Sequence, residues 1–554
     1  MVLLAAAASP HPLASAQGEP FPAGGSEEIQ SYLRRFEDDP ARAMGELPPR
    51  RDEFGVRVRD DDPAESAFNE EERATGRAHE AKDRFRARLC VKGVHGATRC
   101  LDDRGDRRGG PGARAAIGAS DRPEDLIEPA ALGEDRLPRY RTLEQLEEKG
   151  LRMASLPRQP WSGDYWPTAA GLLGARYADP AFPAARPTPV LDWSVNRAHV
   201  RARPAATVAR NGTDADVDRL SPSEKYELFI GSPVFALSET QWRLGEEEFR
   251  EKGSVESWMG ICHGWSSAAL MVRRPERVLS LRSADRRHVL RFYPADLKAL
   301  SSLLWADADI ETRAIGGRCR TRDPRTDANG RVTDPECFDS NPAAWHLAVT
   351  HQIGVAGRGF VLDAAMDYRI WNQPALGYRY SYFNPQTGEA VATLAAARVQ
   401  TSRFTHDKFR AYRPRAAREV VGIVMDFTYV RGTRASQESV DDASRDRVRT
   451  IRYLYDLELD GQGRIIGGEW YTRAHPDFLW VPAAGTRAIS AWEPDATGEW
   501  DGEGELPESW KKAALGAAQD GLPLGRILDV LLSRSARPQT VNAPRIPPGQ
   551  GGRR

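Results

Sequence analysis

One cysteine stands apart from the other four and could act as a nucleophile. Cys90 and Cys100 lie close together in the chain, and Cys319 and Cys337 flank one polar stretch, so each pair could close a local disulfide. Cys262 is then an odd thiol in a run of glycine, tryptophan and small residues that is typical of the start of a buried helix. Such a thiol is either an inert core residue or a nucleophile, and the residues downstream favour the nucleophile.

A thiol nucleophile needs a base and hydrogen-bond donors for the oxyanion that it creates. A helix that begins at Cys262 would supply unpaired N–H groups and the positive end of its dipole, which favour the thiolate. Gly260 permits a tight entry turn, and Gly264 lets the helix approach a neighbour closely. The backbone N–H of Cys262 is the first oxyanion donor that we expect, and the sequence does not identify a second one.

A histidine and an acid follow in a pattern that predicts a hairpin. Residues 345–353 alternate like a strand, and the glycine-rich residues 354–359 would form the turn. His346 would then face Asp363 or Asp367, depending on where the turn is centred. Both acids would lie on one face because their separation is even. A carboxylate beside the imidazole fixes its tautomer and stabilises the imidazolium.

Other histidines compete with His346 for this role. His263 follows the cysteine directly, and on a helix its side chain would point about 100° away. His351 has the opposite parity to His346 on a strand and would face the other side, while His288 and His475 lie elsewhere in the chain. His346 could also be an ordinary core histidine.

The composition disfavours two classes of partner. The formal net charge is −1, with 78 basic and 79 acidic residues, so no basic excess would attract nucleic acid. No run approaches the about 20 apolar residues that a membrane-spanning helix needs. A chain of 554 residues is too long for one core and predicts about two to four structural units.

The chain divides into four regions by composition. Residues 1–16 are apolar and end in small residues, as in a signal peptide, although a positively charged start is missing. Residues 17–150 are highly charged and read as a pro-segment over a cleft or as a linker. Residues 151–535 form the predicted catalytic region, and residues 536–554 a disordered tail rich in proline, glycine and arginine.

The predicted fold class is α+β. Residues 421–430 and 451–459 alternate like strands, and residues 460–463 form a turn into a further strand. These strands predict an antiparallel sheet beside the helix that carries Cys262.

A calcium site is a weaker possibility. Asp327, Asn329, Gly330 and Glu336 occupy the third, fifth, sixth and twelfth places of an EF-hand-like loop, but Arg325 in the first place is no ligand. A solvated loop tied by two cysteines is the simpler interpretation. The sequence therefore establishes no cofactor, and Ca²⁺ is the one that it allows.

Several motifs together resemble the secreted transglutaminase elicitor family over about residues 155 to 485. They are PWSGDYWP (160–167), SPSEKY (221–226), WMGICHGW (258–265), DYRIWNQP (367–374), GGEW (467–470) and HPDFLW (475–480). The resemblance implies a papain-like or transglutaminase-like core with a Cys-His-Asp triad, in which Cys262 is the nucleophile and His346 and Asp363 are the other members. By analogy with animal transglutaminases, Ca²⁺ dependence is possible.

The resemblance therefore implies an exported acyltransferase that joins protein glutamine side chains to lysines or small amines. Trp258, Trp265 and Trp345 could wall the site against water or simply pack the core. A cysteine peptidase or amidase with the same residues is the main alternative, and a secreted recognition module without catalytic activity is another.

Overall fold

A computed structural model provides the three-dimensional structure of the chain. It describes residues 23–46, 50–51, 90–92, 98–100, 122–128, 139–317, 324–334, 337, 340–364, 371–472 and 475–536. The predicted signal peptide, Asp367, Cys319, Glu336 and nearly all of the predicted tail lie outside these residues. The two expected disulfides therefore stay predictions, although strands β2 (Cys90–Lys92) and β3 (Thr98–Cys100) place Cys90 opposite Cys100.

One large antiparallel sheet organises the protein. Its main path has the order β1-β13-β12-β9-β8-β15-β7. The strands are β1 (Arg50–Arg51), β7 (Thr312–Gly316), β8 (Val361–Asp363), β9 (Asn372–Asn384), β12 (Glu419–Arg431), β13 (Arg447–Leu459) and β15 (Phe478–Pro482). The strands predicted at residues 421–430 and 451–459 are confirmed as the paired β12 and β13, and the turn after β13 leads into β14 (Ile465–Gly467). The predicted α+β class with an antiparallel sheet is thus confirmed.

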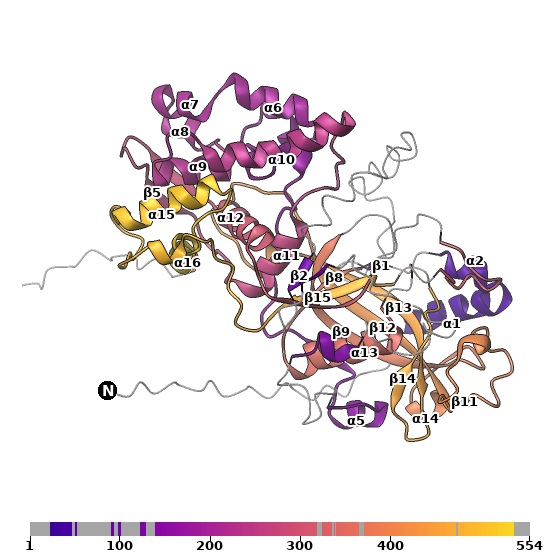
Figure 1. The fold of residues 1–554 in the computed structure, drawn as a ribbon. Helices are drawn as coiled ribbons and strands as arrows, with labels where there is room; N and C mark the ends of the chain where they lie inside the picture. Colours follow the sequence, from indigo (N-terminus) through magenta and orange to yellow (C-terminus); the bar gives the residue numbers. More distant parts are fainter. Residues whose placement is uncertain are drawn as a thin grey trace, which may run out of the picture.

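Helices gather beside this sheet and on both of its faces (Figure 1). A helical layer at the upper left of the view holds α6 (Trp193–Ala202), α9 (Pro222–Ile230), α10 (Ala236–Lys252), α12 (Pro294–Asp307), α15 (Glu508–Gln519) and α16 (Gly525–Ser535). Helix α11 (Cys262–Met271) joins this layer to the sheet, because it packs on α12 and on strands β8, β9 and β15. None of the helices in the described ranges is long and apolar enough to cross a membrane.

Helix α11 begins at Cys262, as the sequence predicts, and close packing fixes its position. The N–H of Ile261 donates to the carbonyl of Tyr165 at 2.7 Å. A Cβ on Gly260 would lie 2.4 Å from that same carbonyl oxygen, so only glycine fits the entry turn. At Gly264, a Cβ would lie 2.1 Å from the Ser302 carbonyl oxygen on α12. Both glycines are therefore required by the approach of neighbouring backbone.

Replacing Gly264 with alanine is expected to destabilise the protein by about 1–3 kcal/mol, because α11 and α12 must move apart to admit the methyl group. Chemical denaturation of the variant and the parent protein measures this loss. Gly461→Ala is the matched control, since the nearest atom to its added Cβ would be 4.0 Å away. Equal stability of the two variants would contradict the predicted crowding.

The strand predicted at residues 345–353 is wrong. Residues Pro342–Val349 form helix α13, and Thr350–Val355 continue it as a π-helical turn. Asn341 caps the helix by accepting the N–H of Ala343, and every residue from 342 to 353 is buried. One of the polar residues that suggested alternation bonds to the helix backbone instead: Thr350 Oγ1 donates to the His346 carbonyl at 2.8 Å.

The two N-terminal helices pack on the sheet at the other end of β9 from Asn372. Helices α1 (Ala23–Asp38) and α2 (Pro40–Met44) bury Tyr32 and Phe36 against Phe383 and neighbouring residues of the sheet. The Tyr32 hydroxyl donates to the Tyr471 carbonyl at 2.6 Å. This part of the predicted 17–150 region is a docked element of the fold, and its cleavage as a pro-segment stays a prediction.

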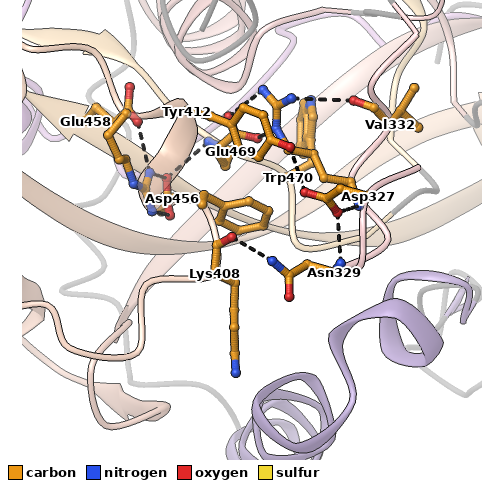
Figure 2. A network of polar contacts seen from close by, with 12 residues as sticks. Asp327, Asn329, Val332, Lys408, Tyr412, Asp456, Glu458, Glu469 and Trp470 are labelled. Carbon is orange, nitrogen blue, oxygen red and sulfur yellow. Dashed lines mark hydrogen bonds and ion pairs between the residues drawn. The ribbon is translucent and has the colours of Figure 1, made fainter. Parts of the chain in front are cut away.

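A buried charge network lies near α2 (Figure 2). Arg331 makes two hydrogen bonds of 2.8 Å to Glu469, and Arg413 contacts Asp407, Asp456 and Glu458 at 2.6–3.1 Å. The four side chains of the Arg413 cluster are at most 7% exposed.

The EF-hand-like loop forms one edge of this network. The Asp327 carboxylate accepts the N–H groups of Asn329 and Arg331 and the hydroxyl of Tyr412, at 2.8–3.0 Å. Both of its oxygens are therefore engaged by donors of the loop and of Tyr412. In the part of the chain that the structure describes, no group of three or more histidine, cysteine, aspartate or glutamate residues is arranged to hold a metal ion.

Candidate active site

Three neighbouring strands bring a set of polar side chains to one face of the sheet. In the β8–β9 pair Asp363 lies opposite Asn372, and in the β8–β15 pair Val361 lies opposite Trp480. Opposed residues of antiparallel strands point to the same face, and so do residues two apart on one strand. Asp363, Asn372 and Trp480 therefore share a face. Helix α11 covers it, with Leu270 packed on Val361 and Trp480.

Three N–H groups converge on the sulfur of Cys262. The side-chain amide of Asn372 donates to Sγ over 3.5 Å. The backbone N–H of Asn372 and that of His263 also bond to the thiol. The His263 group belongs to the first turn of α11, where N–H groups have no acceptor within the helix. The sulfur therefore occupies a place where several donors can stabilise negative charge.

The electrostatic surroundings keep the resting sulfur protonated. Burial raises the pKa of the Cys262 thiol, the hydrogen bonds from Asn372 lower it, and the negative charge of Asp363 raises it. Cys262 is a free cysteine with only 3% of its surface exposed. The Asp363 carboxylate, whose charge acts on the neutral thiol, is therefore a candidate acceptor for its proton.

His346 lies on the opposite face of the sheet from Cys262. Its Nδ1 is 2.8 Å from the Tyr455 hydroxyl, and its ring packs against Tyr380 at 4.7 Å between centroids. The hydrophobic cluster that contains Tyr380 and Tyr455 also includes Leu362. The side chain of Leu362 points away from the side chains of Val361 and Asp363, its neighbours on β8. Burial, together with His351, lowers the pKa of His346 to about 3, so the ring is neutral.

The distance along β9 also indicates that His346 lies far from Cys262. Asn372, which touches the thiol, and Tyr380, which touches His346, are eight residues apart on this strand, or about 26 Å at the usual rise. The expected contact between Cys262 and His346 is therefore not formed. The physical reason is that residues 342–353 are helical, so no hairpin carries the imidazole to the thiol.

The other histidines have separate surroundings. His351 bonds the Leu347 carbonyl through Nδ1 and accepts the N–H of Tyr140 at Nε2. His288 lies 2.9 Å from Asp214, and His475 stacks on Trp470 at 4.9 Å. His263 is buried on α11 directly after the cysteine.

Aromatic side chains near the thiol differ in part from those expected. Trp345 packs in the His346 cluster on the far face, so it cannot wall the site. Tyr165 instead lies close to the thiol: burial chiefly raises its pKa, and the charges of Asp164 and Cys262 contribute. Its ring meets Trp371 edge-on at 5.4 Å, and its hydroxyl donates to the Ser257 carbonyl at 2.8 Å.

Sequence reasoning missed Asn372 and Trp480 as site residues. Both fall within motifs that support the family resemblance, WNQP and HPDFLW. That coincidence was the available signal, but neither residue type suggests a role without the strand register that brings them together.

The fold and site define an α+β protein with a thiol at a helix N-terminus. Residues 236–491 match the family model described as Transglutaminase elicitor, and this stretch contains Cys262, Asp363, Asn372 and Trp480. This region of the chain is therefore similar to the transglutaminase elicitor family.

Among solved structures, the chain is similar to the GP42 transglutaminase from Phytophthora sojae. The identity is 20%, the TM-score is 0.43, and the match covers 69% of this chain and 95% of that one. A comparison with curated proteins finds no match.

Proposed function

We propose that this protein is a secreted protein-glutamine γ-glutamyltransferase that uses Cys262 as its nucleophile. The family match supports the reaction class. The observation that carries the proposal is the convergence of N–H donors on the Cys262 sulfur, with Asp363 beside it. In the proposed centre Asp363 acts as the base, the role that was expected of His346.

The reaction has two steps. Asp363 accepts the thiol proton, the sulfur attacks the carboxamide carbon of a glutamine side chain, and a tetrahedral oxyanion forms. The proton passes to the departing nitrogen, the C–N bond breaks, and ammonia leaves a thioester on Cys262. An amine then attacks the thioester while Asp363 accepts its proton, and the thiol is released as the new amide bond forms.

The burial of the thiol bears on which acceptor is used. Cys262 is 3% exposed, so the substrate must displace part of its cover to reach it. A site that opens only to admit substrate excludes bulk water, which favours an amine over hydrolysis. Partners of the proposed enzyme are proteins that carry accessible glutamine and lysine side chains, or small primary amines.

Incubation with a glutamine-containing protein and a fluorescent primary amine tests the proposal. We expect covalent incorporation of the amine, release of ammonia, and loss of both in Cys262→Ala. Ammonia release without incorporation would instead indicate an amidase, and cleavage of the acceptor protein would indicate a peptidase.

A non-catalytic recognition module is a second candidate, and one observation favours it. The thiol is buried, and the imidazole expected beside it lies across the sheet. In that case the wild-type protein and Cys262→Ala behave identically in the assay, with neither incorporation nor ammonia release.

A further inference from the structure

We propose that Asn372 provides the side-chain donor of the oxyanion hole and that Trp480 is the positioning residue that aims it. This inference rests on the proposed acyl transfer. It supplies the second donor that the sequence could not identify and assigns a role to an indole that does not touch the reacting atoms.

The place of the Asn372 amide suits an oxyanion donor. Its Nδ2 lies 3.5 Å from the Cys262 sulfur in the resting protein. The oxyanion forms on the carbon bonded to that sulfur, so a donor that already reaches the sulfur is within range of the new oxygen. Asn372 is completely buried, and a donor held in a dry site needs little reorganisation during the reaction.

Trp480 determines which end of this amide faces the sulfur. Its Nε1–H donates to Oδ1 of Asn372 over 2.9 Å. An indole N–H can only donate, so it selects the carbonyl end of the amide and turns the NH₂ end towards Cys262. A flipped amide would place a carbonyl oxygen against the sulfur and leave two donors facing each other in a buried site.

The sheet and α11 hold the indole in place. Trp480 is 6% exposed and packs with Val361, Phe478 and Leu270. The register of β15 with β8 fixes the position of Trp480 along the sheet. The register of β8 with β9 fixes the position of Asn372. Strands β8, β9 and β15 together therefore fix the orientation of the Asn372 amide, as a preorganised site requires.

A purely structural role for the indole–amide bond predicts a different outcome. If the bond only satisfies two buried polar groups, its loss lowers stability and leaves the thiol and the chemical step unchanged. If the bond aims the donor, its loss lowers kcat more than it changes KM and makes the thiol harder to ionise.

The test compares Trp480→Phe with Trp470→Phe in the full chain. Phenylalanine keeps an aromatic ring but removes the N–H. Trp470 is an apt control because its buried Nε1 donates to the Ser340 carbonyl at 2.8 Å, away from the thiol. Amine transfer gives kcat and KM, and ultraviolet titration of the thiolate, referenced to Cys262→Ala, gives the ionisation of Cys262 without requiring turnover.

For Trp480→Phe we expect about a 10-fold lower kcat, an unchanged KM and an upward shift of the thiol pKa by about half a unit. Asn372→Ala should lower kcat by about 10²–10³-fold and raise the thiol pKa by about one unit. Trp470→Phe should alter neither quantity. The inference is overturned if both Trp→Phe variants lose the same kcat, or if Trp480→Phe titrates like the parent protein.

The titration also separates this inference from the proposed function. A wild-type protein that transfers no amine refutes the enzyme and, with it, an oxyanion role for Asn372. An upward shift in Trp480→Phe would then still support the orientation of the amide, and an unchanged titration would refute that as well.

Discussion

Replacing Asp363 with asparagine is expected to slow amine transfer by about 10²–10⁴-fold and, at the same time, to make the Cys262 thiol more acidic. The rate falls because asparagine cannot accept the proton of the thiol or of the attacking amine. The thiol pKa falls because the negative charge that raises it is gone. These opposite effects distinguish a base from a residue that only supports the fold, because a loss of structure would not favour the thiolate.

Amine incorporation and ultraviolet titration of the thiolate measure the two effects. His346→Gln is the matched control, because it changes a buried polar residue on the other face of the sheet. We expect it to retain amine transfer within a few-fold. Loss of transfer in His346→Gln with full transfer in Asp363→Asn would contradict the centre proposed here and favour the Cys-His pairing predicted from the sequence.

The strongly periodic parts of the fold could be predicted from the sequence. Strands β12 and β13 are long and paired along their whole length, so their alternation is clear. The start of α11 at Cys262 was also predictable, because a glycine-rich entry followed by small residues suits few other structures. These features depend on local sequence and local packing.

The location of His346 could not be predicted, because a fully buried helix has no polar face. Its few polar residues bond within the helix or to tyrosines of the sheet, as Thr350 and His346 do. Their spacing therefore follows no helical period, and it happened to imitate that of a strand. Burial on all sides removed the signal on which such a prediction depends.

Asp363 was predicted as a site residue by an argument that the structure does not support. It was expected to face His346 across a hairpin, whereas it lies at the end of β8 opposite Asn372. The site instead depends on the register of β8 with β9 and β15, and Trp480 lies more than a hundred residues after Asn372 in the chain. Pairings at that separation leave no periodic trace in one sequence.

Replacing Arg413 with methionine is expected to destabilise the protein by about 3–5 kcal/mol near neutral pH. Arg413 is the cation that contacts Asp407, Asp456 and Glu458, and all four side chains are buried. Burial already raises the pKa of Asp456 and of Glu458, while the charge of Arg413 lowers both. Methionine fills much of the same volume but leaves these acids without their cation.

The pH dependence of this loss identifies its cause. Without Arg413 the folded-state pKa values of the acids rise further above their unfolded values. An acid with a raised folded-state pKa is tolerated when protonated, and stability is lost as the pH rises through that pKa. The difference in unfolding free energy between Arg413→Met and the parent should therefore be larger at pH about 8 than at pH about 5.

Each variant must be compared with the parent at the same pH, because two buried histidines also make stability depend on pH. The pKa of His346 is lowered to about 3 and that of His351 to about 4. Both proteins therefore lose stability as the pH falls below the usual histidine range. Arg410→Met is the matched control, since Arg410 is exposed on the same short turn. Denaturant unfolding of the three proteins at both pH values decides the matter. A loss for Arg413→Met that is equal at both pH values would mean that packing, rather than uncompensated charge, explains its effect.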